Sequence, residues 1–421
     1  MASSITTFAF AIKDRYDKVE HVENLTLADR PLLAMLKKDT DFAGDGTHVP
    51  LIYGNPQGMA AVTVAQSQTS ALASGGNVTG KKFILTAGDY HGSVSIGDKV
   101  IQASRSNPGA FLKNKAQEMD GLFEGMSDAL AHYCYGNGGN TIGTVATGGV
   151  SVGTGINGGD VLTLTEATDT INFEVGMLID SSATDGTTGS GTLTQTDNEV
   201  QAVNRIEGTI DVGTSATSIV ATEYLFRTGD YGDLSGVFIF PGLSAFLWSD
   251  NTPPNLYSMV RTDDPQRLAG SRVPSAALAG RNIEERLQIL GSYMTGRFKG
   301  KGASHGFMNP EDFTTLSIAL QSRGRGMVKD KSTRFGFEYI SVFMGNKDVK
   351  IYSDPFCPKG TFFALRLKDW TLHSMEKLIH PIEADGLTLL RGSSANTYEF
   401  RLVSYPALCC VAPGYSGRVA L

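Results

Sequence analysis

Two glycine-rich stretches have residue types and spacings suited to chemistry. Residues 149–153, GVSVG, match G-x-S-x-G, in which a serine at a strand-to-helix turn acts as a nucleophile. Residues 153–158, GTGING, match G-x-G-x-x-G, which binds dinucleotide phosphates when a helix follows directly. Ser151, however, lies in low-complexity Gly, Thr and Ser, and GTGING leads into DVLTLTEA, whose alternation indicates a strand. We therefore predict neither a catalytic serine nor a cofactor site here.

The other side chains suited to metal binding or proton transfer are dispersed. Asp180, Asp185, Asp197 and Glu199 lack the alternating ligand spacing of an EF-hand loop, so we interpret residues 180–199 as a solvated turn. No CxxC pair or Cys/His cluster occurs, so no metal site is predicted. A Ser-His-Asp triad stays an open alternative, because its members converge only in space. We expect the cysteines to be free, buried thiols in a reducing cytosol. The cysteines and histidines are Cys134, Cys357, Cys409, Cys410, His21, His48, His91, His132, His305, His373 and His380.

Residues 306–320, GFMNPEDFTTLSIAL, form a predicted strand-into-helix turn of a kind that often carries an active site. Asn309 is expected to cap the helix, and Pro310 suits its first turn. Glu311 and Asp312 would face the positive end of the helix. Because each of these residues has a structural role and no nucleophile or phosphate-binding glycine accompanies them, we predict a scaffold without catalysis.

Composition narrows the function classes. The chain has 421 residues, enough for two or three domains, with 41% hydrophobic and 19% charged residues. Its net charge of −7 excludes a basic nucleic-acid footprint, although an acidic chain can still enclose DNA without gripping it. No run of eighteen apolar residues predicts a membrane-spanning helix, and no basic region near the N-terminus predicts a signal peptide.

The first hundred residues predict an arm and a hairpin. A helix is expected up to Asp29, and Pro31 can open a second one whose apolar face is Leu32, Leu33 and Leu36. Residues 59–66 and 81–100 are predicted as the two strands of a long hairpin, joined by a small, polar loop tip. The hairpin has few large apolar residues, so we expect it to need a partner surface.

A long helix is predicted over residues 108–135. Its apolar residues recur at steps of four and three, which keeps one face apolar throughout. Gly121 and Gly125 each cost about 1 kcal/mol against Ala, so we expect another backbone to pass close by. A coiled coil is the alternative to a packed helix. The apolar residues are Leu112, Ala116, Met119, Phe123, Met126, Leu130 and Tyr133.

Residues 136–225 differ from the rest in being rich in Thr, Gly, Ser and Asp. Short strands separated by turn residues are predicted at 160–167, 174–180, 191–196, 199–206 and 217–226. Their even spacing predicts a small β-barrel or sandwich, inserted into the chain. From residue 226 onward we expect mixed helices and strands, with a helix carrying Ile283, Leu287 and Leu290 and long strands near the C-terminus.

The order of parts, with several local phrases, resembles the major capsid (coat) protein of tailed bacteriophages, whose fold is shared with the floor of herpesvirus capsids. The resemblance covers nearly the whole chain except residues 138–225. It implies an α+β fold with an N-terminal arm, an extended hairpin loop, a peripheral domain with a long spine helix, an axial domain and a small β-barrel-like insertion domain. The phrases lie at 242–274, 306–313 (GFMNPEDF), 351–365 (IYSDPFCPKGTFFAL) and 393–421.

The resemblance also implies a division of the chain. The expected parts are the N-terminal arm at 1–50, the extended hairpin loop at 51–98, the peripheral domain with its spine helix at 99–137, the insertion domain at 138–225, more of the peripheral domain at 226–280, the axial domain at 281–374 and the C-terminal strands of the peripheral domain at 375–421.

The function implied is a structural one. The protein would assemble with itself into pentamers and hexamers of an icosahedral shell that encloses double-stranded DNA, and it would not be an enzyme. Scaffolding and portal proteins are the expected further partners, with no membrane. Because no long charged scaffolding segment precedes the arm, a separate scaffolding protein, or none, is expected. Its location would be the virion, after assembly in the host cytoplasm.

Some relatives crosslink subunits through Lys and Asn, but Lys81 and Lys82 are better explained as a solvated strand end. The alternatives are a phage tail-tube or decoration protein, whose chains are usually shorter and mostly β, and a hydrolase with a spatially assembled triad.

Overall fold

The computed structural model describes residues 27–421 with gaps, and the first predicted helix of the arm lies mostly outside the described residues. The positions in that range without a description are 28, 41, 43–45, 57, 62, 73–76, 98–107, 188–190, 214–218, 234–238, 298–301, 323–328, 332–336, 384–388 and 392–396.

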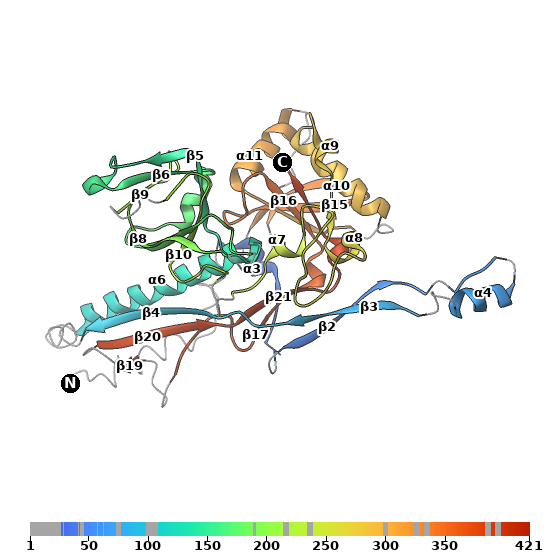
Figure 1. Ribbon diagram of the computed structural model, residues 1–421, viewed down its shortest axis with the longest axis horizontal. Coiled ribbons are helices and arrows are strands. Elements are labelled where there is room, and N and C mark those ends of the chain that lie inside the picture. The colour runs from blue at the N-terminus through green and yellow to red at the C-terminus, as the bar shows by residue number, and fades with distance from the viewer. Residues whose placement is uncertain are drawn as a thin grey trace.

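The molecule is elongated and combines helices with strands, so the predicted α+β class is confirmed. Figure 1 shows long strands and a long helix at the lower left, continued to the right by a thin arm. A barrel lies above the helix, and a sheet with helices lies above the root of the arm (Figure 1). No described helix has the length and apolar character needed to cross a membrane.

The long helix α6 (Pro108–Tyr135) is found over the predicted residues. It packs on β4 (Tyr90–Gly97), which pairs along its length with β20 (Thr397–Ser404). Further along β20, β18 (His380–Pro381) and β19 (Leu389–Arg391) complete this sheet. The Phe123 and Phe400 rings lie 6.4 Å apart. The predicted apolar face is buried wherever its side chains are described, at Met119, Phe123, Met126, Leu130 and Tyr133.

The two helix glycines are explained differently from the prediction. An added Cβ at Gly121 or Gly125 would meet no atom within 4 Å. Among the described residues no other backbone passes close to Gly121 or Gly125, contrary to the prediction.

The short helix α3 (Pro31–Met35) opens at Pro31 as predicted, with Leu32 and Leu33 buried. The Leu32 N–H donates to the buried Asp354 carboxylate (3.2 Å), which also accepts from the Tyr135 hydroxyl (2.8 Å). A sheet follows in the order β1-β17-β21. Its strands are β1 (Lys37–Asp39), β17 (Trp370–Ser374) and β21 (Pro406–Cys410).

A further sheet, called the second sheet below, has the order β11-β22-β16-β12-β15-β14-β13. It packs against α10 (Ile283–Arg297) and α11 (Pro310–Ser322). The predicted face of α10 is buried at Leu287 and Leu290. The strand that ends the chain, β22, lies between β11 and β16 rather than beside β20 and β21. The strands are β11 (Ser271–Arg272), β12 (His305–Met308), β13 (Lys329–Lys331), β14 (Glu338–Met344), β15 (Lys347–Ser353), β16 (Thr361–Leu365) and β22 (Gly417–Ala420). Short helical turns nearby are α7 (Leu243–Phe246), α8 (Pro265–Leu268), α9 (Ser275–Leu278), η5 (Leu367–Asp369) and η6 (Pro413–Tyr415).

The Thr/Gly-rich region forms a closed barrel in the order β10-β5-β6-β9-β8-β7, around its own apolar core. The prediction split residues 191–206 into two strands, but β8 runs through both. It also missed β5 and β9, because β5 is rich in Gly and Thr and β9 has four residues. The elements are β5 (Gly143–Ser151), η3 (Ile156–Gly158), β6 (Asp160–Leu164), η4 (Ala167–Asn172), β7 (Leu178–Ser182), β8 (Leu193–Asn204), β9 (Thr209–Val212) and β10 (Tyr224–Arg227).

The hairpin is built differently from the prediction. Its first strand is β2 (Thr47–Gly54), which pairs with β3 (Thr79–Leu85). Where residues 59–66 were predicted as a strand, α4 (Val64–Ser70) begins, capped by the Thr63 side chain, which accepts from the Gln66 N–H at 3.2 Å. The strand predicted over 81–100 divides at residues 86–89, because β3 pairs with β2 and β4 pairs with β20.

Candidate assembly surface

The arm, defined as β2, α4 and β3, reaches away from the remaining elements (Figure 1). In the described part of the chain, β2 and β3 pair only with each other. The ladder runs from Thr47 opposite Leu85 to Gly54 opposite Thr79. A pair of strands without a further strand or a covering helix is marginally stable in water. The stability of the arm therefore depends on the contacts at its root and on any further surface that the arm contacts.

The root of the arm is fixed by burial and by charge. Phe83 is buried, with its ring 5.6 Å from that of Phe246 in an edge-on arrangement. The Lys81 ammonium lies 2.7 Å from Asp263 and donates to a backbone carbonyl, and the Arg267 guanidinium donates to the Tyr53 carbonyl. The interpretation of Lys81 as part of a solvated strand end is therefore wrong, because its side chain is mostly covered and paired.

The tip of the arm is uncharged and exposed, and it combines small polar residues, as predicted, with several large apolar side chains. No Asp, Glu, Lys, Arg or His occurs between Asn55 and Gly80. Helix α4 has seven residues and buries none of them. Isolated helices shorter than about 12 residues are marginal in water, so α4 is expected to be marginal without a further contact. Large apolar side chains along the arm are exposed at Ile52 (71%), Met59 (73%), Val64 (73%), Leu72 (88%) and Val78 (50%).

The barrel is attached to the end of α6 through a buried polar junction. The Tyr133 hydroxyl donates to Asp230 at 2.7 Å, and the Asn140 amide donates to the Asp230 carbonyl at 2.9 Å. Burial raises the pKa of Asp230, although the Tyr133 hydrogen bond opposes this. Burial lowers the pKa of His132, whose Nε2 lies 2.9 Å from the Thr141 carbonyl. Neutral His132 thus donates to that carbonyl, and the nearby Arg227 guanidinium opposes the rise in the pKa of Asp230.

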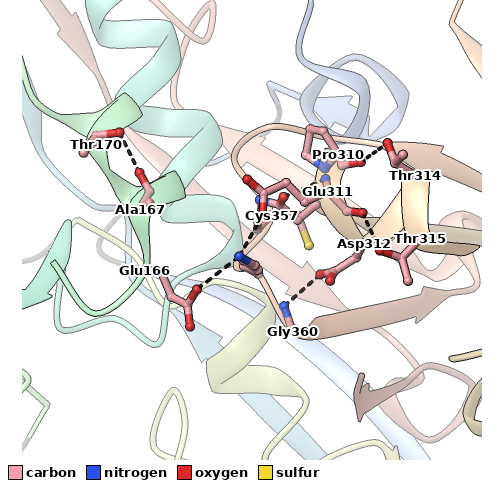
Figure 2. A network of polar contacts seen from close by, with 12 residues as sticks. Glu166, Ala167, Thr170, Pro310, Glu311, Asp312, Thr314, Thr315, Cys357 and Gly360 are labelled. Atoms are coloured by element: carbon pink, nitrogen blue, oxygen red, sulfur yellow. Dashed lines mark hydrogen bonds and ion pairs between the residues drawn. The ribbon is translucent and has the colours of Figure 1, made fainter. Parts of the chain in front are cut away.

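The predicted strand-into-helix turn lies where the barrel meets the second sheet (Figure 2). Asn309 caps α11, as predicted, by accepting from the Glu311 N–H at 3.1 Å. The Asp312 carboxylate accepts from the Gly360 N–H at 2.8 Å. The Lys359 ammonium lies 2.7 Å from Glu311 and 3.7 Å from Glu166 of the barrel. The acids thus hold the loop between β15 and β16 and tie the barrel to it.

The two glycine-rich motifs lie at the outer tip of the barrel. Ser151 is the exposed last residue of β5, and the chain turns through η3 into β6. This is a strand–turn–strand arrangement, whereas a nucleophile elbow needs a helix after the serine. The Gly153 N–H donates to Asp160 at 2.8 Å, within the same turn.

The four acids of residues 180–199 occupy separate environments. Asp180 is buried, so its interpretation as part of a solvated turn is wrong: its carboxylate accepts from the Asp197 N–H (3.0 Å) and the Thr228 hydroxyl (2.9 Å). Asp185 accepts from the Asn137 amide at 2.9 Å. Across the described residues, no three His, Cys, Asp or Glu side chains gather as a metal site would require.

The histidines do not assemble a triad with the described residues. Nδ1 of His305 lies 2.8 Å from the hydroxyl of its neighbour Ser304, and burial together with Lys350 lowers the His305 pKa to about 4. His380 lies 3.1 Å from Glu376, and Asp39 lies opposite His373 in the sheet. Burial lowers the pKa of His373, and His21 lies outside the described residues. His48 lies beside Lys82, and the His91 ring lies beside that of Tyr405.

All four cysteines are buried and free, as predicted. Burial raises the pKa of the Cys134 and Cys409 thiols to about 12. These thiols therefore stay protonated near neutral pH and are poor nucleophiles.

Sequence reasoning missed two features of this surface. The helix at the arm tip is short and lacks apolar periodicity, although Thr63 followed by Val-Ala-Gln-Ser is compatible with a capped start. The contact of Lys359 with Glu166 joins residues far apart in the chain, and no local pattern signals it. The uncharged stretch from Asn55 to Gly80 was the available signal for an apolar contact surface.

Solved structures similar to this chain include three of low sequence identity. They are the cyanophage A-1(L) capsid (11% identity, TM-score 0.44, 94% of this chain and 93% of that chain), the SrpI encapsulin from Synechococcus elongatus PCC 7942 (9%, 0.42, 94% and 88%) and Gordonia phage Cozz (10%, 0.43, 93% and 86%). No protein-family model and no curated protein matches the chain.

Proposed function

We propose that the chain is a capsid subunit that assembles with copies of itself into the pentamers and hexamers of a closed icosahedral shell. The observation that carries this proposal is the exposed, uncharged tip of the arm. The tip is ordered around α4 but buries none of that helix against the described chain. A second copy of the chain would provide the surface on which the arm tip is buried.

The energy available at the tip is sufficient for a cooperative shell. Fully burying a large aliphatic side chain stabilises a contact by about 1.5–3 kcal/mol. Met59, Val64 and Leu72 are each more than two thirds exposed. Subunit contacts of this kind cover about 1,000–2,000 Å², and many modest contacts per copy close a shell by avidity.

The geometry favours ring formation. The arm leaves the body at one side, and its tip lies far from the barrel and from α6 (Figure 1). A tip that docks on a different face of the next copy makes a heterologous contact, and heterologous contacts close into rings when the rotation allows. The buried root, with Phe83 and Lys81, keeps the direction of the arm the same from copy to copy.

The remaining parts of the proposal follow from this role. The shell would enclose double-stranded DNA without sequence-specific binding, which suits a net charge of −7. Scaffolding and portal proteins would be the further partners, and the subunit would reside in the virion after assembly in the host cytoplasm. The protein would perform no catalysis. Residues 51–98 would form the extended loop, 99–137 the spine part and 138–225 an insertion on the outer face, with 281–374 as most of the axial domain.

The test is assembly of the full chain and of two matched variants, followed by size-exclusion chromatography and negative-stain microscopy. The wild type is expected to give shells, sheets or rings of five and six. Leu72→Asp should stay monomeric with an unchanged circular dichroism spectrum, because it places a charge in the proposed contact. Ile206→Asp is the control, since Ile206 of the barrel is exposed to 94% and should tolerate the change.

The other outcomes decide between functions. A Leu72→Asp variant that assembles like the wild type would remove the arm from the assembly surface. Open tubes would favour a tail-tube protein. A wild type that stays monomeric even when a scaffolding protein is co-expressed would overturn the capsid proposal.

A further inference from the structure

The chain contains two Asn-Gly steps, at Asn137 and at Asn157, and the structure gives them opposite environments. An Asn-Gly step can react with itself, because the backbone nitrogen of the glycine lies within reach of the asparagine side-chain carbonyl carbon. Glycine offers no side chain to obstruct this approach and leaves the backbone free to rotate. Folded structure decides whether the approach happens.

Asn157 is in the open environment. It lies in η3 at the outer tip of the barrel, exposed and in the left-handed region at φ 53° and ψ 25°. Within the described residues its side-chain amide has no hydrogen bond. The Gly158 N–H makes a long hydrogen bond of 3.3 Å to the Gly155 carbonyl. The space around Gly158 itself is open, since an added Cβ there would meet no atom within 4 Å, whereas one at Gly159 would lie 2.1 Å from the Val212 carbonyl oxygen.

Asn137 is in the closed environment. Its side-chain amide donates to the Asp185 carboxylate at 2.9 Å, and its side-chain oxygen accepts from the Gly139 N–H at 3.0 Å. The glycine of this step also has a close neighbour, since an added Cβ at Gly138 would lie 3.5 Å from the Pro241 Cα atom, where one at Gly158 would meet nothing. Both polar atoms of the Asn137 side-chain amide are held by hydrogen bonds, which oppose its rotation toward the reactive geometry.

We propose that Asn157 is a site of spontaneous covalent modification, at which the barrel tip deamidates. The Gly158 backbone nitrogen loses its proton to hydroxide and bonds to the Asn157 side-chain carbonyl carbon. The bond from that carbon to the side-chain nitrogen breaks, and ammonia leaves with a proton from water. Water then opens the resulting five-membered imide at either carbonyl, which yields aspartate or isoaspartate. No oxidant or reductant takes part.

The product changes the chemistry of the tip while sparing the fold. A new carboxylate appears beside Val152 and Ile156, both of which are exposed. Isoaspartate also lengthens the main chain by one carbon in a turn that the closed barrel does not need for its core. The modification therefore adds a negative charge to a turn that already has the Asp160 and Asp211 carboxylates beside it.

The experiment is incubation of the full chain at mildly alkaline pH in water enriched in oxygen-18, followed by peptide mapping with mass spectrometry. The peptide with Asn157 is expected to gain the heavy oxygen, while the peptide with Asn137 stays unmodified. The same incubation in denaturant should convert both steps at similar rates, because the local sequences then have equal freedom. Asn157→Gln should abolish the native-state product, since the longer side chain closes the ring poorly.

A variant of the closed site sharpens the test. Asp185→Ala removes the partner of the Asn137 amide and is expected to make Asn137 a second modified site, in protein whose circular dichroism spectrum is that of the wild type. The proposal is overturned if native Asn157 keeps its amide while the denatured chain is converted. It is equally overturned if Asn137 and Asn157 react at the same rate in the native wild type, a comparison that needs no variant to fold.

Discussion

The barrel and the arm both project from the body, but the barrel buries its large apolar side chains whereas the arm tip exposes them. The barrel closes its ladder from β10 back to β7, so no strand edge is left, and its apolar residues fill an interior of their own. The arm has an open pair of strands and a helix with no buried residue. A closed projection is stable by itself, whereas an open one is stable only against a partner. Under the proposed function, the arm is therefore the projection expected to make the contact between copies.

The largest expected effect is in the barrel core. Phe173→Ala removes a fully buried ring there and should cost about 3–5 kcal/mol. Because the barrel has its own core, hydrogen exchange should rise in residues 143–227 while the sheet that holds β12 and β16 keeps its protection. Uniform loss of protection throughout the chain would contradict the independence of the barrel.

The next effect is a pH dependence of barrel stability. Burial, with Glu166 as a second cause, raises the pKa of Asp169 in η4 to about 7. A carboxyl group whose pKa is higher in the folded state binds its proton more tightly there, so stability falls as pH rises from about 4 to about 7. Asp169→Asn should remove this dependence and stabilise the barrel by roughly 1–3 kcal/mol at pH 8, with little change at pH 4. Urea unfolding of the wild type and of Asp169→Asn at the two pH values measures this difference in the free energy of unfolding. An equal effect at both would contradict the assignment.

A smaller effect is expected at the tie between barrel and body. Lys359→Met should weaken the attachment of the barrel to the body by about 0.2–1 kcal/mol of free energy. The effect is small because the ion pair between Lys359 and Glu166 is partly exposed. Spin labels attached at Val152→Cys in the barrel and Ile318→Cys in α11 report the distribution of distances between the barrel and the body. The labels react only at these two sites, because the native thiols are buried and unreactive.

The variants of the two acids separate the roles of the tie. Glu166→Gln should broaden the distribution as Lys359→Met does. Glu311→Gln should narrow it, because Glu311 competes for the same ammonium at 2.7 Å. Lys347→Met, at an exposed lysine of β15, is the matched control and should leave the distribution unchanged. Broadening by the control would show that net charge, rather than the tie, sets the barrel position.

The smallest effect on stability is expected at the arm tip. In the unassembled protein, Leu72→Ala should change the free energy of unfolding by less than about 0.5 kcal/mol, because the side chain is 88% exposed. The same substitution at Phe83, in the root, should cost several times more, since that ring is buried against Phe246. Equal costs in a chemical denaturation series would mean that the tip is already covered within one chain.

Much of the fold could be predicted where one local pattern dominates. The helix over 108–135 followed from apolar residues at steps of three and four, and Asn309 and Pro310 marked the start of α11. Prediction failed where pairing decides the structure. The strand expected at 59–66 has no partner to pair with and is replaced by a capped helix, and β5 was missed because its Gly and Thr residues become a strand only inside the closed barrel. Buried Asp180 and paired Lys81 were misjudged because burial depends on distant segments.

By itself the sequence determined the periodicity of the long helix, the uncharged arm tip, the composition of the barrel region and the absence of a metal-binding motif, because each is a property of neighbouring residues. Only the tertiary structure decided that β3 and β4 take different partners, that Gly121 and Gly125 face open space, and that Asn137 is held by Asp185 while Asn157 is free to react. The physical reason is the same in each case. Strand pairing, side-chain burial and hydrogen-bond partners come from segments far apart in the chain, and a one-dimensional pattern does not encode which of them meet.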